Sequence, residues 1–166
     1  MPLTLAQKQA LKADIIASSD PACEALEASP GNADFAFAVK DLYNAEASPA
    51  FVVWKTRTSR QEILQNGFDW TRLDNLSVGK ARVWNDIFVD GYISAAKPNV
   101  RAGIEAVWVG TAADLAVRAV VYGHCKRNAS RVEKLLASGT GTTETPATMG
   151  YEGPLSYQDV LDAMQS

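Results

Sequence analysis

The chain is poor in the residues that most often hold metals or act as nucleophiles. It has one histidine, His124, and two cysteines, Cys23 and Cys125, among its 166 residues. A protein zinc site usually takes four nitrogen or sulfur ligands, so these three residues are too few for one. The two cysteines are isolated and follow no motif, which is typical of reduced thiols in a cytosolic protein rather than of a disulfide framework.

Long apolar runs and a strong basic excess are also missing. No run approaches the ~18 apolar residues of a membrane helix, and no basic stretch followed by an apolar one indicates a secretory signal. The net charge is −3, and no segment has the basic excess that neutralising nucleic-acid phosphates requires. We therefore expect neither a membrane nor sequence-specific nucleic acid as a partner.

The motifs that resemble chemical sites fail on their spacing. Gly139-Thr140-Gly141-Thr142-Thr143 lacks the Gly-Lys-Ser/Thr of a phosphate loop, and a helix C-cap with a turn is the better interpretation. His124 and Cys125 are neighbours on a helix, so their side chains point apart. Three of the four tryptophans lie at core positions, which favours packing over a ligand site. The sequence predicts no catalytic, cofactor-binding or metal-binding residue.

Charge is distributed unevenly along the chain. Residues 1–50 carry three basic and seven acidic residues, residues 51–137 carry thirteen and eight, and residues 138–166 carry none and four. The acidic ends either fold back onto the basic middle or meet the basic face of a neighbouring copy. Under the second alternative the predicted interface includes a basic cluster at Lys126, Arg127, Arg131 and Lys134, expected to lie near acidic residues of another chain.

Helix signals dominate the chain. Capping boxes, in which a Ser or Thr and an acid or amide three residues later satisfy each other's backbone N–H groups, are predicted at Thr4/Gln7, Ser59/Glu62, Thr111/Asp114 and Ser156/Asp159. Further helices are predicted to begin at Asp20-Pro21, Asn32, Ser77 and Pro98. Gly67 is predicted to end the helix that begins at Ser59, and Gly91 the helix that begins at Ser77. We expect a mainly α, compact, multi-helix single domain over residues 1–166. The expected common core is Trp84, Phe88, Ile104, Trp108, Leu115 and Val120.

A long connection near the C-terminus is the least helical part of the chain. Residues 138–155 are rich in Thr, Gly and Pro, and at about 18 residues they far exceed the usual 4–6. We expect an extended, ordered interaction loop here, whose Ala147–Tyr151 pairs with the apolar strand at 51–56 as one short two-stranded β element. Gly139–Thr145 has no evident anchor in its own domain. Neighbouring chains are expected to hold it through Gly139, Thr140, Gly141, Thr142 and Thr143.

Four blocks of the chain resemble a known group of proteins. They are Ser48-Pro-Ala-Phe-Val-Val-Trp54, Lys97-Pro-Asn-Val-Arg101, Arg131-Val-Glu-Lys-Leu135, and the block from Ser138 to Val160. Together they resemble small, mostly unassigned proteins encoded among the virion-structure genes of tailed bacteriophages. The resemblance covers almost the whole chain and implies a phage particle component, and it supplies no catalytic residues.

The resemblance implies a non-enzymatic structural protein of the virion, made in the cytoplasm of the bacterial host. We expect a head–tail neck, connector or tail component that forms a ring from copies of itself and contacts portal, neck or tail subunits. Alternatives are a baseplate, tail-appendage or capsid-associated virion protein, and a non-virion assembly chaperone. A small helical ligand-binding protein or enzyme, which would use the Trp-lined interior, is the alternative from another class.

Overall fold

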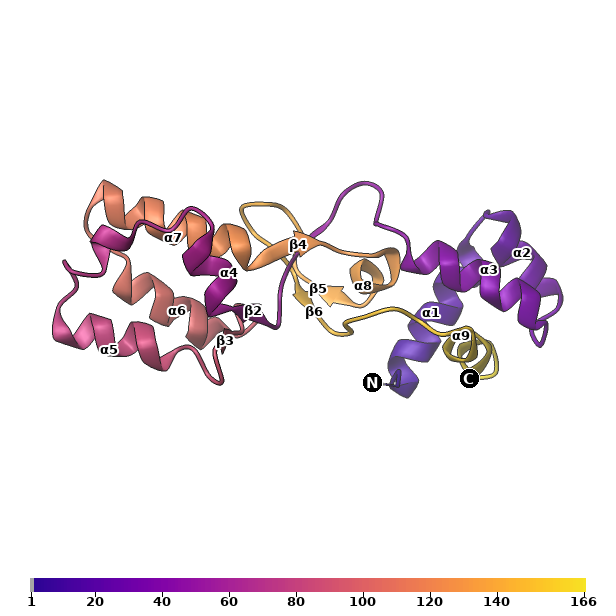
Figure 1. The fold of residues 1–166 in the computed structure, drawn as a ribbon. Helices are drawn as coiled ribbons and strands as arrows, with labels where there is room; N and C mark the ends of the chain where they lie inside the picture. The colour runs from indigo at the N-terminus through magenta and orange to yellow at the C-terminus, as the bar shows by residue number, and fades with distance from the viewer. Residues whose placement is uncertain (1) are drawn as a thin grey trace. The chain divides into compact units, whose positions relative to one another are not determined.

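The structure, a computed structural model, describes residues 2–166 and is mainly helical, as predicted (Figure 1). Within these residues there are nine α-helices, one 3-10 helix and three two-stranded antiparallel sheets. The helices are α1 (Leu5–Ala17), α2 (Pro21–Ala28), α3 (Ala33–Asn44), α4 (Arg60–Gln65), α5 (Val78–Asp86), α6 (Pro98–Val107), α7 (Ala112–His124), α8 (Arg131–Leu135), α9 (Tyr157–Met164) and the 3-10 turn Trp70–Arg72. The sheets pair β1 (Val52–Trp54) with β4 (Lys126–Asn128), β2 (Thr58–Ser59) with β3 (Tyr92–Ile93), and β5 (Ala137–Ser138) with β6 (Thr148–Met149).

Contacts within the chain divide it into two compact units. Unit 1 comprises residues up to Val52 together with Asn128–Ser166, and unit 2 comprises Val53–Arg127. The chain leaves unit 1 in β1 and returns in β4. Unit 1 is thus assembled from both ends of the sequence, whereas unit 2 is continuous. That residues 1–166 form one domain stays a prediction.

Unit 1 is held together by helices from opposite ends of the sequence. In it α9 packs against both α1 and α3, while α2 packs against α1 and α3 (Figure 1). Leu11 and Ile15 of α1 and Val160 of α9 are fully buried, and burying such a side chain stabilises the fold by about 1.5–3 kcal/mol. The core further includes Leu3, Cys23, Leu26, Ala36, Val39, Tyr43, Val132, Tyr151, Leu155, Ala163 and Met164.

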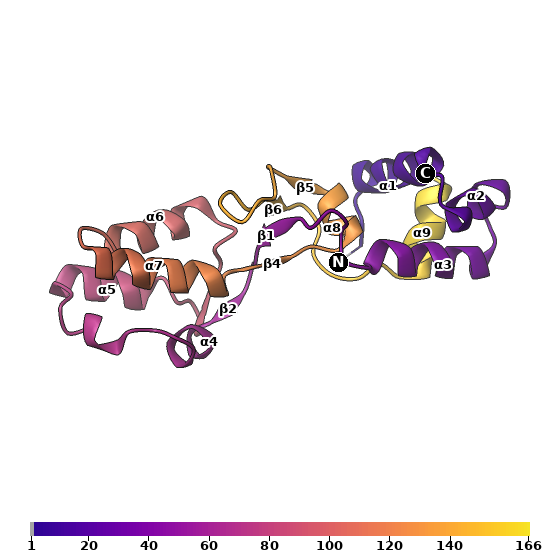
Figure 2. The same ribbon diagram turned by 90° about the horizontal axis from the view of Figure 1, so that it is seen from above.

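Unit 2 has an aromatic core. The rings of Trp84 and Trp108 lie 5.2 Å apart in an edge-to-face arrangement, and Phe68 contacts both. Such offset and edge-to-face pairs are the geometries that ring quadrupoles favour. Helix α5 packs against α6 and α4 packs against α7 around this cluster, and Figure 2 shows these four helices from above. The remaining core side chains are Trp54, Ile63, Leu64, Ile93, Ala95, Ile104, Val107, Val117, Val121 and Cys125.

Most predicted helix starts are confirmed. Full capping boxes close at Thr4/Gln7, Thr111/Asp114 and Ser156/Asp159, and Asp20, Asn32 and Ser77 cap their helices through side-chain oxygens. Ser59 also caps its helix, but the carboxylate of Glu62 bonds the Lys55 ammonium at 2.8 Å instead of completing a box. A further capping box, Ser130/Glu133, was not predicted.

The predicted partner of the apolar strand is wrong. β1 pairs with the polar segment Lys126–Asn128, and the loop residues Thr148–Met149 pair with Ala137–Ser138. The loop still lies beside β1, because the Ala147 N–H donates to the Val52 carbonyl at 2.9 Å. Strand pairing satisfies backbone N–H and C=O groups whatever the side chains are. The Lys-Arg-Asn segment can therefore pair with β1, because the path of the chain places it beside that strand.

Two expectations about unit 2 are also corrected. Leu115 is 44% exposed and Val120 is only partly buried, so neither belongs to the fully buried core, contrary to the prediction, and α7 buries only one face. Trp84, Ile104 and Trp108 are buried as predicted, with Phe88 packed at the edge of their cluster. Helix α5 ends at Asp86, and Gly91 instead forms a turn before β3, in which Gly91 and Asp90 both have positive φ.

Candidate interaction surface

A turn closed by threonine hydroxyls organises the predicted interface segment Gly139–Thr145. The Thr140 hydroxyl donates to the Thr145 carbonyl at 3.0 Å, and the Thr145 N–H donates to the Thr142 hydroxyl at 3.0 Å. The Thr145 hydroxyl lies within hydrogen-bonding distance of both other hydroxyls. The segment therefore satisfies many of its own polar groups, which lowers the cost of ordering it.

This turn is also anchored to β1 within unit 1. The Val52 N–H donates to the Gly141 carbonyl at 2.7 Å, and the Ala147 N–H donates to the Val52 carbonyl. Gly141 is buried with φ 69°, and a Cβ at this position would overlap the Phe51 ring. The expectation that Gly139–Thr145 lacks an anchor in its own domain is therefore wrong. Glycine at 141 creates the anchor because it lets the backbone reach an aromatic face.

The anchored turn forms one wall of an open groove. The groove has a volume of about 540 Å³ and is lined by Pro49, Ala50, Phe51, Val52, Lys134 and the segment 140–144. The Lys134 ammonium lies 3.5 Å from the Pro49 carbonyl and 5.8 Å from the centre of the Phe51 ring. The groove thus offers an aromatic surface, one cation (Lys134), one carboxylate (Glu144) and threonine hydroxyls, a mixture suited to a peptide with polar and apolar side chains.

Lys134 also borders a second cavity, of about 530 Å³, beside Arg131. The Arg131 guanidinium lies 3.3 Å from Asp14 and 4.4 Å from the centre of the Tyr43 ring, and the Tyr43 hydroxyl donates to the same carboxylate at 2.6 Å. Burial raises the pKa of Tyr43 most, and the hydrogen bond to Asp14 raises it further, so the phenol stays neutral. Arg131 therefore pairs with an acid from the N-terminal end of its own chain, as the folding-back alternative predicted.

The four basic residues predicted as one cluster are divided between the units. Arg131 and Lys134 lie in α8 of unit 1, whereas Lys126 and Arg127 lie in β4 at the end of unit 2. The Lys126 ammonium lies 5.2 Å from the centre of the Trp54 ring, a distance typical of a cation–π contact. Of the predicted interface residues, Lys134 and the Thr140–Thr143 segment meet in one groove.

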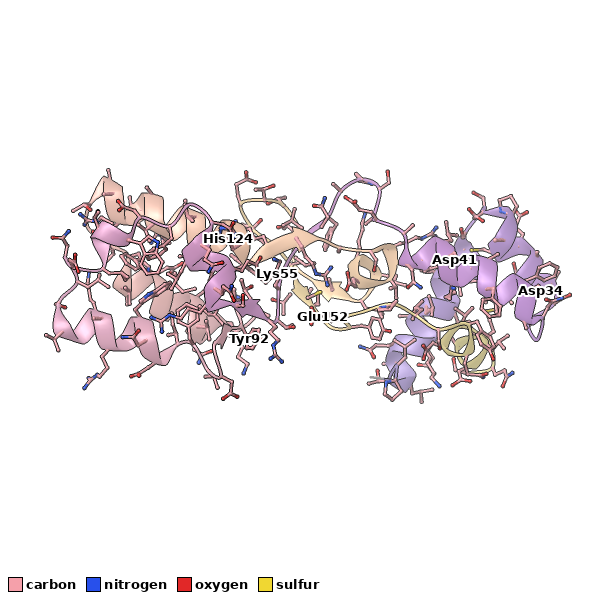
Figure 3. The ribbon with its side chains drawn as sticks, viewed as in Figure 1. Asp34, Asp41, Lys55, Tyr92, His124 and Glu152 are labelled. Atoms are coloured by element: carbon pink, nitrogen blue, oxygen red, sulfur yellow. The ribbon has the colours of Figure 1, made fainter. Side chains whose placement is uncertain are left out.

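The other sequence candidates have structural roles. His124 is the last residue of α7, where its Nε2 lies 2.8 Å from the Asn66 carbonyl (Figure 3). Burial raises the pKa of Cys125 to about 11 and also raises that of Cys23, which keeps both thiols protonated near neutral pH. Trp54, Trp84 and Trp108 are buried as predicted, whereas Trp70 is 55% exposed.

Within residues 2–166, no three His, Cys, Asp or Glu side chains come together in a group that could hold a metal ion. No helix between these bounds is both long and apolar enough to cross a bilayer.

No family model, curated protein or solved structure matches the chain.

The groove is the feature that the sequence predicted only in part. The sequence predicts Thr140–Thr143 and Lys134 as interface residues, but in the wall formed by Pro49–Val52 it predicts only that Phe51 and Val52 belong to a strand. The sequence signal for this wall is Gly141, because a glycine between two threonines in an ordered loop indicates that another group approaches the backbone closely there.

Proposed function

We propose that the chain is a non-enzymatic structural protein of a tailed-phage virion. In this proposal it is made in the cytoplasm of the bacterial host and belongs to the head–tail neck or the tail. It forms a ring from copies of itself and contacts portal, neck or tail subunits. The four sequence blocks 48–54, 97–101, 131–135 and 138–160, which resemble phage virion-module proteins, are the starting point.

One structural observation supports an interaction role for these blocks. Although they lie far apart in sequence, three of the four contribute to the same groove: Phe51 from block 48–54, Lys134 from block 131–135 and Thr140–Glu144 from block 138–160. The groove is built by hydrogen bonds within unit 1, so a partner meets a surface that is already ordered. Preorganisation of this kind lowers the entropic cost of association.

The first test is the composition of purified particles. Quantitative mass spectrometry of particles of the encoding phage should find the chain in a fixed copy number relative to the portal protein. An assembly chaperone or an enzyme would be absent or substoichiometric. Absence from particles that are otherwise complete overturns the proposal.

A second test asks whether the groove is the part that engages the particle. Lys134→Glu should reduce incorporation while the isolated chain keeps its circular dichroism spectrum and melting temperature. Lys12→Glu makes the same charge change on α1 of the same unit, outside the groove, and should incorporate normally. Equal incorporation of both variants would move the interface away from the groove.

A further inference from the structure

The two units carry opposite net charge. Unit 1 has five basic and twelve acidic residues, a net of −7, whereas unit 2 has eleven basic and seven acidic residues, a net of +4. The chain-wide value of −3 conceals this division. Because opposite charges on different surfaces steer encounter and select partners, two copies of the chain have complementary faces available to one another.

Unit 1 presents aromatic rings between exposed acids. Asp34, Phe37 and Asp41 occupy one face of α3 at helical spacing, and Asp34 and Asp41 are labelled in Figure 3. The Phe37 ring stacks on Tyr157 of α9 at 4.5 Å, yet it is 44% exposed. The Lys40 ammonium pairs with Asp41 at 2.8 Å and lies 5.2 Å from the centre of the Phe37 ring, yet the Asp41 side chain stays 74% exposed and accessible to a second cation. We call Asp34, Phe37, Asp41 and Tyr157 the acidic–aromatic stripe.

Unit 2 presents a cavity with a mixed lining, in which apolar side chains lie beside two cations. The cavity has a volume of about 330 Å³, and its charged members are Arg57, Lys97 and one acid, Asp90. Neither cation forms an ion pair within the described residues, and the Arg57 guanidinium lies 3.6 Å from the centre of the Tyr92 ring, labelled in Figure 3. The other lining residues are Thr56, Ile87, Val89, Ile93, Ser94 and Val100. We call this cavity the basic pocket.

We propose that the basic pocket of one copy receives the acidic–aromatic stripe of a second copy. Phe37 enters the apolar part of the pocket, while Asp34 and Asp41 lie beside Arg57 and Lys97. This contact unites a buried aromatic ring and an arginine stacked on an aromatic ring, which concentrate binding energy in interfaces. The paired charges at its rim steer encounter and select the partner.

The contact is heterologous, because a patch of one copy meets a different patch of the next. Heterologous contacts repeat from copy to copy and close into a ring where the rotation between copies allows it. This contact rests on the proposed function in one respect only, which is that the copies it joins close into a ring. The pairing of stripe and pocket is a property of the isolated chain and is tested without particles.

The experiment is a charge swap on the full chain, followed by sedimentation velocity. Asp34→Lys with Asp41→Lys reverses the stripe, and Arg57→Glu with Lys97→Glu reverses the pocket. Wild type should self-associate at about 100 μM in low salt, whereas each reversed variant alone should associate at least about 10-fold more weakly. Mixing the two variants should restore association, because the reversed stripe of one then matches the reversed pocket of the other.

Matched controls change the same charges elsewhere. Glu24→Lys with Glu27→Lys on α2 and Lys80→Glu with Arg82→Glu on α5 alter each unit's net charge by the same amount outside stripe and pocket. Both controls should associate like wild type. A monomeric wild type, failure of the mixture to associate, or equal loss in the controls overturns the contact. The proposal that the chain is a virion protein is overturned by a different result, the absence of the chain from purified particles.

Discussion

Gly141→Ala tests whether the groove depends on the close approach of the Gly–Thr turn to Phe51. Gly141 has φ 69°, which costs alanine about 1–2 kcal/mol. The new methyl would also overlap the Phe51 ring, and forcing such a group into packed structure costs about 1–3 kcal/mol. We therefore expect Gly141→Ala to lower the free energy of unfolding by about 2–5 kcal/mol.

Urea denaturation followed by circular dichroism measures this loss. With an m-value of about 2 kcal/mol/M, the midpoint should fall by about 1–2.5 M. The double variant Phe51→Ala with Gly141→Ala removes the ring, so relative to Phe51→Ala alone it should retain only the backbone cost of about 1–2 kcal/mol. The difference between the two backgrounds reports the steric contact itself.

Two other glycines provide controls. Gly91 has φ 77° but open space where a Cβ would lie, so Gly91→Ala should show the backbone cost alone, about 1–2 kcal/mol. Gly79 lies within α5 with open space around it, and Gly79→Ala should be neutral or stabilise the chain by about 0.5–1 kcal/mol. If Gly141→Ala costs no more than Gly91→Ala, the ring contact does not hold the turn, and the anchored groove is refuted.

Three further predictions concern the cores and their titrating groups. Trp108→Ala removes a fully buried ring and should cost about 3–5 kcal/mol in urea denaturation; a loss below about 1 kcal/mol would mean that Trp108 is not core. The Arg72 guanidinium at 2.7 Å and the Thr111 hydroxyl hold the pKa of Asp114 below its usual range, so this carboxylate stabilises the fold above about pH 4 and ceases to do so as pH falls through its folded pKa. The difference in unfolding free energy between wild type and Asp114→Asn should therefore shrink on acidification. A difference that stays constant with pH would contradict a lowered pKa of Asp114 in the folded chain. Because burial raises the pKa of Cys125 to about 11, an aromatic disulfide reagent at pH 8 should titrate no thiol in the native chain and both thiols in urea; rapid native labelling would contradict burial.

Local signals accounted for most of the helical architecture. A cap depends on residues within one turn of each other, so Thr4/Gln7, Thr111/Asp114 and Ser156/Asp159 could be recognised without knowing the fold. Leu115 was misjudged because an apolar sequence on all sides of a helix does not state how many neighbours the helix has. Small side chains such as alanine tolerate solvent, and α7 consequently leaves much of its surface exposed.

Strand pairing between segments far apart in the sequence could not be predicted from such local signals. The strand Lys126–Asn128 has no apolar or β-branched residue, and its pairing follows from where α7 delivers the chain. Half of the groove was anticipated, since Thr140–Thr143 and Lys134 stand out by composition and charge. The Phe51 wall was missed because only the folded chain brings residues 51 and 141 together.

The discontinuity of unit 1 has a consequence for synthesis on the ribosome. Unit 2 is a continuous segment and can complete its core as soon as Arg127 has emerged, whereas α1, α2 and α3 await α9, which is translated later. During that interval the apolar faces of the early helices, including Leu11 and Ile15, are uncovered. We therefore expect nascent chains to be most dependent on cellular chaperones between the emergence of α3 and that of α9, and a stop codon before Tyr157 to yield an aggregating product.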